Sequence, residues 1–521
     1  MLRILREEAA APKSYWEEMS LAEADTRFGQ WCGWLYFPVD EGQKVRACMD
    51  CRELNLLSVL PETCWMPGVD GVVDLVRLMA RTLGPEELRF AREDWANGFR
   101  QLRLREQDKR FLCAVAWDAS KSPGEELRVF SPRMLMFGPR PGPSQFCRTS
   151  AGLVEVANVY LAICCVVHVD DTIIVDTSPE LEHARRCFVS LADTLQCKQK
   201  EAKAFPPRGA GGASCGPCLG VLLELPDRRG PGDVVCKLSI PDDKKEKYVA
   251  DLNRMLSSDS LLPGAAAKLV GRLEWAASAC FGRAARSFLW PLRDRQRGLD
   301  QGGSRLSPAL RAAGQALVGF VKQARGLSFR SSDAGRETVV GCVDASSAGH
   351  SACLGGVLIT DVGGAFFVAE VGERLRRWLP EGSSSVINEA EALAALVWLQ
   401  TFSQHLQGTD VLLFLDSEAA EGSLLSGYSK NRNLTAISGA FWTLSASRQI
   451  RVWIGRVSSR LNPSDGVSRR DRTWVEAQGW REVRPVDPPV APWRFLLEGG
   501  GEPLPRARRR QDARRVRNQG Q

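Results

Sequence analysis

Two adjacent aspartates interrupt an apolar strand pattern in the segment VVHVDDTIIV (residues 166–175). β-Branched and apolar residues on both sides favour strands, and a polar pair between two such runs is typical of a hairpin turn. Asp170 and Asp171 would then lie at the tip of a β-hairpin, where their like charges repel unless a cation lies between them. A plain surface turn is the alternative, because aspartate is common in turns.

A third carboxylate, Asp94, ends the strand-like stretch LRFARED (residues 88–94) and is followed by WANGFRQLRL. A carboxylate at the end of a strand, together with an Asp–Asp hairpin, is what two-metal phosphoryl transfer requires. In that chemistry two ions about 3.5–4 Å apart activate the attacking oxygen and hold the leaving oxygen. Spacing alone does not establish that these aspartates meet.

A second set of carboxylates lies beyond residue 339, where three strand patterns are followed by alternating helix and strand. This order indicates an α/β unit with a mixed sheet. Asp344 lies in the first strand, Glu391 in the helix INEAEALAALVW, Asp416 at the end of a later strand, and Asp465 in NPSDGVSR. Glu389 competes with Glu391, because residues two apart on a helix point in different directions and periodicity does not choose between them.

Length and composition limit the class of protein. At roughly 100–200 residues per domain, 521 residues suggest three or four compact units. The 44% hydrophobic and 25% charged residues exclude a mostly disordered, collagenous or small disulfide-stapled chain. Most of the net charge of +7 comes from residues 506–521, which hold seven Arg and one Asp, so a nucleic-acid groove in the rest of the chain needs local clustering of basic residues.

The expected location is the cytoplasm or nucleus. The longest apolar run, residues 159–167, is too short to span a bilayer, which takes about 20 residues, and the first residues lack the apolar core of a secretory signal. The 16 Cys are therefore expected to be reduced thiols. CGPC (residues 215–218) and the Cys48/Cys51 pair are better explained as such thiols than as redox or zinc sites.

Gly- and Pro-rich segments and the spacing of apolar residues predict the loops, strands and helices along the chain. Residues 206–217 and 226–233 are Gly- and Pro-rich and predict loops, while residues 221–225 and 234–240 predict the two arms of a hairpin. Residues 242–297 have helical apolar spacing, as at Tyr248, Leu252 and Met255. The last ~50 residues are rich in Pro, Gly and Arg and are expected to be poorly ordered.

Five segments occur in the same order as the motifs of retroviral and retrotransposon reverse transcriptases, and together they resemble them. They are KVRACMDCRELN (44–55), DWANGFRQLRL (94–104), MLMFGPRPGPSQF (134–146), HVDD (168–171) and CLG (218–220). RFGQW (27–31) and LVGRLEWAASACFGRAARSFLWPL (269–292) look most like the DIRS class of retrotransposons. The resemblance spans about residues 27–470, and its order makes chance an unlikely explanation.

The resemblance implies roles in an RNA-directed DNA polymerase, a nucleotidyltransferase. Asp94 and Asp170 would bind two Mg²⁺ ions, with Mn²⁺ as a substitute, and Asp171 would support them. The implied contacts are Lys44 and Arg46 with the incoming dNTP, Phe99 as the steric gate that excludes a ribose, and Leu219 and Gly220 with the end of the DNA primer. A helical thumb would hold the hybrid of RNA template and DNA by its backbone.

The C-terminal α/β unit resembles the RNase H domain fused to such polymerases, a hydrolase that acts as an endonuclease on RNA–DNA hybrids. Asp344, Glu391, Asp416 and Asp465 match its four metal-binding carboxylates, and the family's spacing favours Glu391 over Glu389. Two residues depart from the family's motifs: His168 stands where an aromatic residue is usual, and Met136 where Pro is usual. The position of the motif lysine is ambiguous between Lys200 and Lys203.

The predicted fold class is therefore multidomain α/β and α+β, a right-hand polymerase followed by an RNase H-like mixed α/β domain. The predicted segments are an extension (1–26), fingers and palm (27–225), hairpin and helical thumb or connection (226–330), RNase H-like domain (336–470) and a disordered tail (471–521). The Arg-rich tail either binds RNA, serves as a nuclear address or is simply solvated. The alternative to an active transposable-element enzyme is a catalytically inactive, nucleic-acid-binding remnant adopted by a host.

Overall fold

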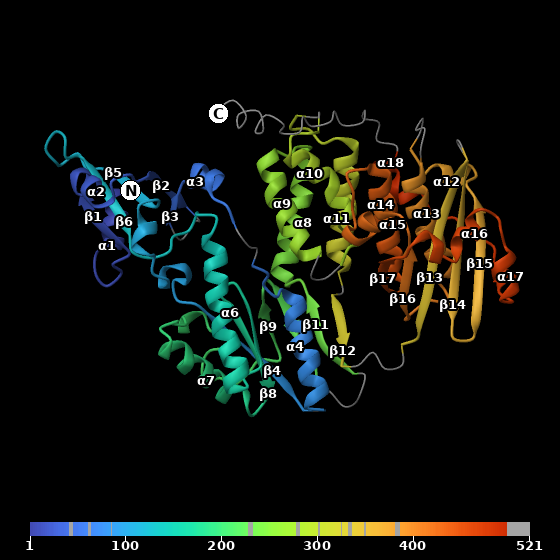
Figure 1. Ribbon diagram of the computed structural model, residues 1–521, viewed down its shortest axis with the longest axis horizontal. Helices are drawn as coiled ribbons and strands as arrows, with labels where there is room; N and C mark the ends of the chain where they lie inside the picture. The colour runs from blue at the N-terminus through green and yellow to red at the C-terminus, as the bar shows by residue number, and fades with distance from the viewer. Residues whose placement is uncertain are drawn as a thin grey trace. The chain divides into compact units, whose positions relative to one another are not determined.

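Figure 1 shows the computed structural model, which describes residues 1–40, 45–60, 64–84, 86–227, 233–277, 282–300, 303–324, 326–331, 336–348, 351–380 and 386–497. The chain divides into an N-terminal unit, Met1–Leu238 with Ser328–Ser332, and a C-terminal unit, Ser239–Leu327 with Asp333–Gln521. Helices and several sheets occur in the described residues, so the chain is a mixed α/β multidomain protein. This division is coarser than the predicted boundaries at residues 225, 330 and 470, which stay predictions.

The first sheet of the N-terminal unit has five strands in the order β1-β6-β5-β2-β3. These are β1 (Trp16–Ser20), β6 (Leu127–Pro132), β5 (Cys113–Trp117), β2 (Gly33–Asp40) and β3 (Val45–Met49), accompanied by α1 (Leu2–Ala9), α2 (Leu21–Phe28), α3 (Arg52–Leu57) and α5 (Glu106–Lys109). Ser20 and Glu23 form a capping box that starts α2 directly after β1. Trp16, Tyr36 and Phe130 are buried in the core of this sheet.

The second sheet is antiparallel, in the order β4-β8-β7, and confirms the predicted hairpin. It contains β4 (Leu88–Asp94), β8 (Asp171–Thr177) and β7 (Cys165–His168), with α4 (Val69–Thr82), α6 (Gly142–Leu161), α7 (Leu181–Thr194) and the short 3-10 helices η1 (Gly98–Gln101) and η2 (Glu201–Lys203) nearby in the chain. Val169 takes a left-handed conformation, with φ of 58°, which lets the hairpin turn within two residues. Ile174, Phe146 and Phe188 are fully buried in the core of this sheet.

The third sheet, in the order β12-β11-β10-β9, contains β9 (Cys215–Cys218), β10 (Val221–Glu224), β11 (Val234–Ser239) and β12 (Leu327–Arg330). Strands β10 and β11 are neighbours, as expected for the predicted hairpin arms. The predicted loop over residues 206–217 is too long, because Cys215 already belongs to β9. Its pairing with β10 (Cys218 with Val221) supplies hydrogen bonds that the Gly-rich composition did not reveal.

The helical pattern predicted for residues 242–297 is confirmed. It forms α8 (Asp242–Ser258), α9 (Pro263–Ala276), η4 (Ser287–Leu289) and α10 (Trp290–Gln296), and α11 (Pro308–Gln323) follows. Tyr248, Leu252 and Met255 are the buried residues of α8, which matches the predicted apolar face. Helix α8 packs against α11, and α9 packs against α10.

The C-terminal unit is built around a six-stranded mixed sheet in the order β17-β16-β13-β14-β15-β18. Strands β13, β14 and β15 are antiparallel, while β16 and β17 run parallel to β13. The strands are β13 (Thr338–Ala348), β14 (Ser351–Thr360), β15 (Gly363–Glu370), β16 (Asp410–Leu415), β17 (Arg451–Arg456) and β18 (Arg481–Glu482). The order of elements from residue 339 is the predicted one, with two exceptions: a short helix, α12 (Glu373–Arg376), follows β15, and two helices rather than one separate β16 from β17.

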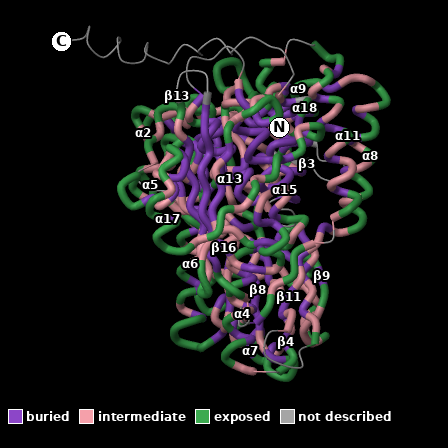
Figure 2. The backbone as a smooth tube through the Cα atoms, turned by 90° about the vertical axis from the view of Figure 1, so that its right-hand side faces the viewer, coloured by how far each residue is buried: buried purple, intermediate pink, exposed green. Residues whose placement is uncertain are grey.

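The helices of this region are α12 (Glu373–Arg376), α13 (Ile387–Phe402), α14 (Glu418–Ser426), α15 (Arg432–Ser447), α16 (Ser464–Ser468), α17 (Thr473–Ala477) and α18 (Arg494–Leu497), with the 3-10 helices η5 (Ser459–Leu461) and η6 (Ala491–Trp493). Helix α13 packs on β13 and β14 and on α15, so it is buried on nearly every side, as Figure 2 shows. Gly341 makes room for it: a Cβ there would lie 2.8 Å from Cε2 of Trp398.

Residues 471–497, predicted to belong to a disordered tail, are folded. They form α17, β18, η6 and α18; β18 pairs with β15, and Trp493 is buried. The Pro-rich composition misled the prediction because these segments pack on an existing core instead of forming one. Residues 498–521, including the Arg-rich stretch, lie outside the described residues.

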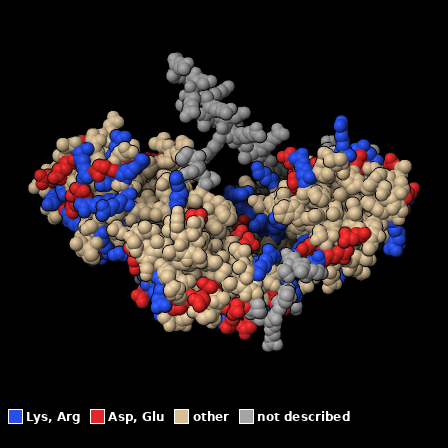
Figure 3. Space-filling view, turned by 60° about the horizontal axis from the view of Figure 1, so that its bottom comes forward, with Lys and Arg blue, Asp and Glu red and all other residues tan. Residues whose placement is uncertain are grey.

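Figure 3 shows Lys and Arg side chains interspersed with Asp and Glu on the face that it draws, in keeping with the nearly balanced charge of the chain without its tail. Within the described ranges, none of the helices combines the length and hydropathy that crossing a membrane requires.

Candidate functional site

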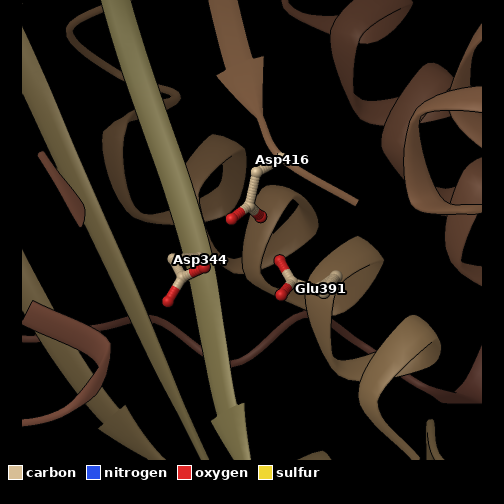
Figure 4. Close-up of side chains that lie close together, drawn as sticks. All are labelled: Asp344, Glu391 and Asp416. Atoms are coloured by element: carbon tan, nitrogen blue, oxygen red, sulfur yellow. The ribbon is translucent and has the colours of Figure 1, made fainter. Parts of the chain in front are cut away.

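Three carboxylates from three different elements meet at one end of the six-stranded sheet. Asp344 lies on β13, Glu391 in α13, and Asp416 immediately after β16. The parallel strands β13 and β16 pair Cys342 with Phe414. Asp344 and Asp416 each come two residues later, so the same register brings them side by side. One carboxylate oxygen from each acid lies within 4.8 Å of the other two. Figure 4 shows the three side chains pointing toward one another.

Burial and crowding make this triad electrostatically unfavourable on its own. Asp344 and Glu391 expose 4% and 6% of their surface. Burial, with added repulsion from Asp344 and Asp416, raises the pKa of Glu391 to about 9. Burial also raises the pKa of Asp344 to about 6, an effect that a hydrogen bond from Ser468 opposes.

The donor set of the triad fits a divalent cation. Carboxylate oxygens are the ligands that Mg²⁺ prefers, and Mn²⁺ accepts them as well. Oε2 of Glu391 is buried and has no hydrogen-bond partner among the described residues, so this oxygen is available as a ligand. A cation would also replace the repulsion within the triad by attraction. Asp344, Glu391 and Asp416 can therefore bind a metal ion.

The fourth predicted carboxylate, Asp465, stands beside the triad without joining it. It lies in α16, and its Oδ1 forms an ion pair of 2.7 Å with Nη2 of Arg469. Its charge contributes to the raised pKa of both Asp344 and Glu391, so it lies close to them.

Glu389, the competing acid on α13, has a different contact. Its Oε1 accepts a hydrogen bond of 2.6 Å from the side-chain amide of Asn431, the residue that caps α15. Glu389 thus ties α13 to α15, while Glu391 faces Asp344 and Asp416.

The predicted polymerase carboxylates occupy the end of the three-stranded sheet. Asp94, the last residue of β4, pairs directly with Asp171, the first residue of β8, so both lie on the same face. Asp170 is in the hairpin turn, and its carbonyl oxygen accepts a hydrogen bond from the backbone N–H of Trp95. Among the described residues, only the triad of the C-terminal unit brings three candidate ligand atoms within 4.8 Å of one another.

Cations face two of these aspartates. Nζ of Lys203 lies 2.8 Å and 2.7 Å from Oδ1 and Oδ2 of Asp94. Nε of Arg92 lies 3.8 Å from Oδ1 of Asp171, and it opposes the rise that burial causes in the pKa of Asp171. Between the two candidate motif lysines, Lys203 makes the side-chain contact, whereas Lys200 donates its backbone N–H to the carbonyl of Asp94.

Phe99 is half-buried beside this sheet end. Its ring stacks on Phe146 with centroids 4.8 Å apart and contacts Phe137 at 4.7 Å.

Leu219 and Gly220 form the two-residue turn between β9 and β10, with φ of 47° and 83°, the conformation that a tight hairpin needs.

Lys44 lies outside the described residues, and of Arg46 only the backbone, in β3, is described. Two residues depart from the motifs that the sequence resembles. His168 pairs with Asp171 across the hairpin, with its Nδ1 2.9 Å from the carbonyl oxygen of Pro67, and Met136 is fully buried.

Several residues around both carboxylate sets were not predicted. Ser459 donates a hydrogen bond of 2.6 Å to Oδ2 of Asp416, and Ser468 donates one to Oδ2 of Asp344. Next to Asp94, the fully buried Glu93 pairs with Arg185 at 2.6 Å. Serines and an Arg–Glu pair far apart in the sequence carry no pattern that would have identified them; only the position of Ser468, three residues after Asp465, was a usable signal.

No protein-family model matches the chain, and neither does any curated protein. Among solved structures, the chain is similar to the foamy viral protease-reverse transcriptase dRH in complex with double-stranded DNA, with 13% sequence identity and a TM-score of 0.43. The match covers 82% of this chain and 65% of that one, so the chain spans about two thirds of the viral protein's length.

Proposed function

We propose that the chain is a retrotransposon-derived reverse transcriptase with a fused RNase H, resembling the DIRS class. Its substrates would be an RNA template, a DNA primer, dNTPs and the resulting RNA–DNA hybrid. The observation that carries the proposal is the convergence of Asp344, Glu391 and Asp416 within 4.8 Å at the end of a mixed sheet. Bound Mg²⁺ would there activate water and stabilise the leaving oxygen of a phosphodiester.

In the nuclease half, the residues of this chain hold and orient the ligands. Asp344 and Glu391 would bind the cation as carboxylates, so a proton that burial holds on either side chain, above all on Glu391 with its pKa of about 9, would have to leave. Ser459 fixes one oxygen of Asp416 and leaves the other free. Asp465 is the proposed fourth ligand, once it leaves Arg469.

In the polymerase half, Asp94, Asp170 and Asp171 are the proposed Mg²⁺ ligands. The direct pairing of Asp94 with Asp171 across β4 and β8 supports this assignment. The stack of Phe99 on Phe146 gives the proposed steric gate a rigid ring, which suits the exclusion of a ribose 2′-OH. Further proposed contacts are those of Lys44 and Arg46 with the triphosphate and of Leu219 and Gly220 with the primer end.

Cleavage of the labelled RNA strand of an RNA–DNA hybrid in Mg²⁺ tests the nuclease half. Glu391→Gln is expected to lower the cleavage rate by about 10²-fold or more, because it removes a charged ligand. Glu389→Gln is the matched control: it lies on the same helix, is equally buried, and its amide oxygen still accepts from Asn431. Equal activity in the two variants would contradict the proposed site.

Primer extension tests the polymerase half, with oligo(dT) on poly(rA), Mg²⁺ and dTTP. The double variant Asp170→Asn, Asp171→Asn is expected to abolish extension while hybrid cleavage continues, because the two carboxylate sets lie in separate units. Extension that survives in this variant would show that these aspartates do not hold the metals.

A nucleic-acid-binding remnant without polymerase activity is the second candidate. The observation that favours it is the ion pair of Lys203 with both oxygens of Asp94. The ammonium group of Lys203 lies where a metal ion would bind to this proposed ligand. A folded wild-type chain that binds the primer–template but does not extend it would establish this alternative for the polymerase half.

A further inference from the structure

Helix α16 packs on a strand position that has no side chain. Asp344 on β13 pairs with Gly355 on β14. A Cβ at Gly355 would lie 2.9 Å from the Cα of Ser468 and 3.0 Å from the carbonyl oxygen of Ser464. Only glycine therefore lets the backbone of α16 approach the sheet directly opposite Asp344.

The closely packed helix is tied to β13 on both sides of Asp344. The hydroxyl of Ser346 donates to the carbonyl oxygen of Ser468 at 2.7 Å. Two residues before the helix, the side-chain amide of Asn462 donates to the carbonyl oxygen of Val343 at 3.0 Å. These two contacts leave α16 little freedom to slide along the strand.

Ser468 makes the contact with the carboxylate itself. Its side chain is fully buried, and its hydroxyl donates a hydrogen bond to Oδ2 of Asp344. The same hydroxyl lies 3.0 Å from the carbonyl oxygen of Asp465, one turn earlier on the helix. One side chain thus touches the first carboxylate of the triad and the backbone of the residue proposed as its fourth ligand.

We infer that Ser468 is a positioning residue of the metal site, which orients Asp344 and holds the helix that brings Asp465 to it. This inference rests on the proposed nuclease function. A hydroxyl suits the role because it saturates one oxygen of Asp344 and leaves Oδ1 for the cation. Hydrogen bonds of this kind fix the orientation of a ligand, and their removal typically lowers metal affinity by about 10–100-fold.

The same arrangement supports the proposed role of Asp465 as a fourth ligand. Without a cation its carboxylate is held by Arg469, the residue after Ser468. To serve as a ligand of a bound cation, Asp465 would have to exchange its partner Arg469 for that cation.

Mn²⁺ titration calorimetry on the full chain tests the inference, with Asp170→Asn, Asp171→Asn as the background so that heat from those carboxylates is removed. Further substitution of Asp344→Asn identifies the heat that belongs to the triad. Ser468→Ala is expected to weaken Mn²⁺ binding at the triad by about 10-fold or more. Ser445→Ala is the control, since Ser445 is also a buried serine of the C-terminal unit but donates to the carbonyl oxygen of Ile450, away from α16.

The outcomes separate this inference from the proposed function. If the background chain binds Mn²⁺ and Ser468→Ala binds it equally well, or if both serine variants weaken binding alike, the positioning role is overturned while the metal site stands. If the background chain shows no heat that Asp344→Asn removes, the metal site itself fails and the inference fails with it. Should Ser468→Ala not fold, Ser468→Cys keeps the volume with a weaker donor, and wild-type affinity in that variant would equally overturn the role.

Discussion

Glu391 and Asp94 are both buried acids, yet they are neutralised in different ways. Asp94 has an ammonium partner in Lys203, and only 6% of its surface is exposed. Glu391 is buried and has other carboxylates as neighbouring charges, which together raise its pKa to about 9 in the metal-free protein. The charge of Asp94 is thus compensated by a neighbouring side chain, whereas the raised pKa of Glu391 makes that group sensitive to pH.

The first prediction concerns the pH dependence of stability in the presence of a chelator. The pKa of Glu391 lies above its ordinary value of 4.5, so the folded state binds this proton more tightly than the unfolded state does. The free energy of unfolding should then fall as pH rises from about 5 to 9, by at most about 1.4 kcal/mol per pH unit from this group. Urea unfolding at several pH values checks this.

Glu391→Gln is the control, because it has no proton to lose in this range. Its unfolding free energy should depend less on pH than that of the wild type, and the two should converge toward pH 5. Parallel profiles would show that Glu391 does not carry the effect.

The second prediction concerns Lys203. Its ammonium occupies both oxygens of Asp94, so a cation that binds there must displace it. Lys203→Ala should lower the Mg²⁺ concentration that half-saturates binding at this site, measured by Mg²⁺-dependent thermal stabilisation. Lys200→Ala, which loses no side-chain contact with Asp94, should leave that concentration unchanged; the same shift in both variants would argue for a general charge effect.

At the scale of elements, a buried ion pair connects β4 with α7. Arg185 and Glu93 expose 1% and 0% of their side chains, and Arg185 also donates to the carbonyl of Pro206 at 2.7 Å. Arg208 forms a second ion pair with Glu93 at 2.7 Å. Strand β4, which ends in Asp94, is thus held to α7 and to the segment that contains Pro206 and Arg208. This segment directly follows η2, the short helix that ends in Lys203.

The third prediction follows from this pair. Arg185→Ala should lower the free energy of unfolding by about 3–5 kcal/mol, because it leaves the charge of Glu93 buried with one partner fewer. Arg186→Ala is the control, since Arg186 is exposed on the same helix and should change stability by no more than about 0.5 kcal/mol. Denaturant unfolding of both variants measures the difference, and similar losses would contradict the assignment.

Elements with a strong local pattern were predictable. The periodicity of α8 gave its buried face, and apolar runs around Asp170 and Asp171 gave the hairpin. The folded segment at residues 471–497 was missed, because its order comes from contacts such as β18 with β15 and not from its own composition. The second helix before β17 was missed although its signals are present: Gly427 ends α14 in a left-handed conformation, and Asn431 caps the start of α15.

The candidate site was predictable only as far as its acids. The resemblance named Asp344, Glu391 and Asp416, and its spacing favoured Glu391 over Glu389 where helical periodicity did not decide. The structure places Glu391 beside Asp344 and Asp416 and Glu389 against Asn431. Ser459 could not be named, because a serine becomes a partner of a carboxylate only through the packing of separate elements, and Ser468 was indicated only by its place three residues after Asp465.

At the scale of the whole chain, the helices α8–α11 and the six-stranded sheet belong to one compact unit. Aromatic and basic side chains join them: Arg432 lies over the ring of Trp290 at 5.0 Å, and Arg293 over Tyr428 at 4.2 Å. Arg286 donates to the carbonyl oxygen of Ser426 at 3.0 Å. These contacts favour cooperative unfolding of the helices with the sheet.

The fourth prediction is that calorimetry detects this cooperativity. Leu273→Ala in α9 and Leu413→Ala in β16 each empty a buried position and should cost about 2–5 kcal/mol in the same thermal transition. Ile174→Ala in β8 should move a different transition, that of the N-terminal unit. Separate transitions for the Leu273 and Leu413 variants would show that the helices unfold independently of the sheet.

The outer strand β17 has a consequence for how copies of the chain meet. Its centre, Val452 to Ile454, is apolar, and Trp453 is 69% exposed, whereas Arg451 and Arg456 stand exposed at its two ends. An edge of this composition would otherwise be a template for strand addition by a neighbouring molecule, and charged side chains at its ends oppose it, here in the ion pairs of Arg451 with Asp410 and of Arg456 with Glu418. The guanidinium groups on β17 thus guard against aggregation, and the protection should weaken as salt screens their charge.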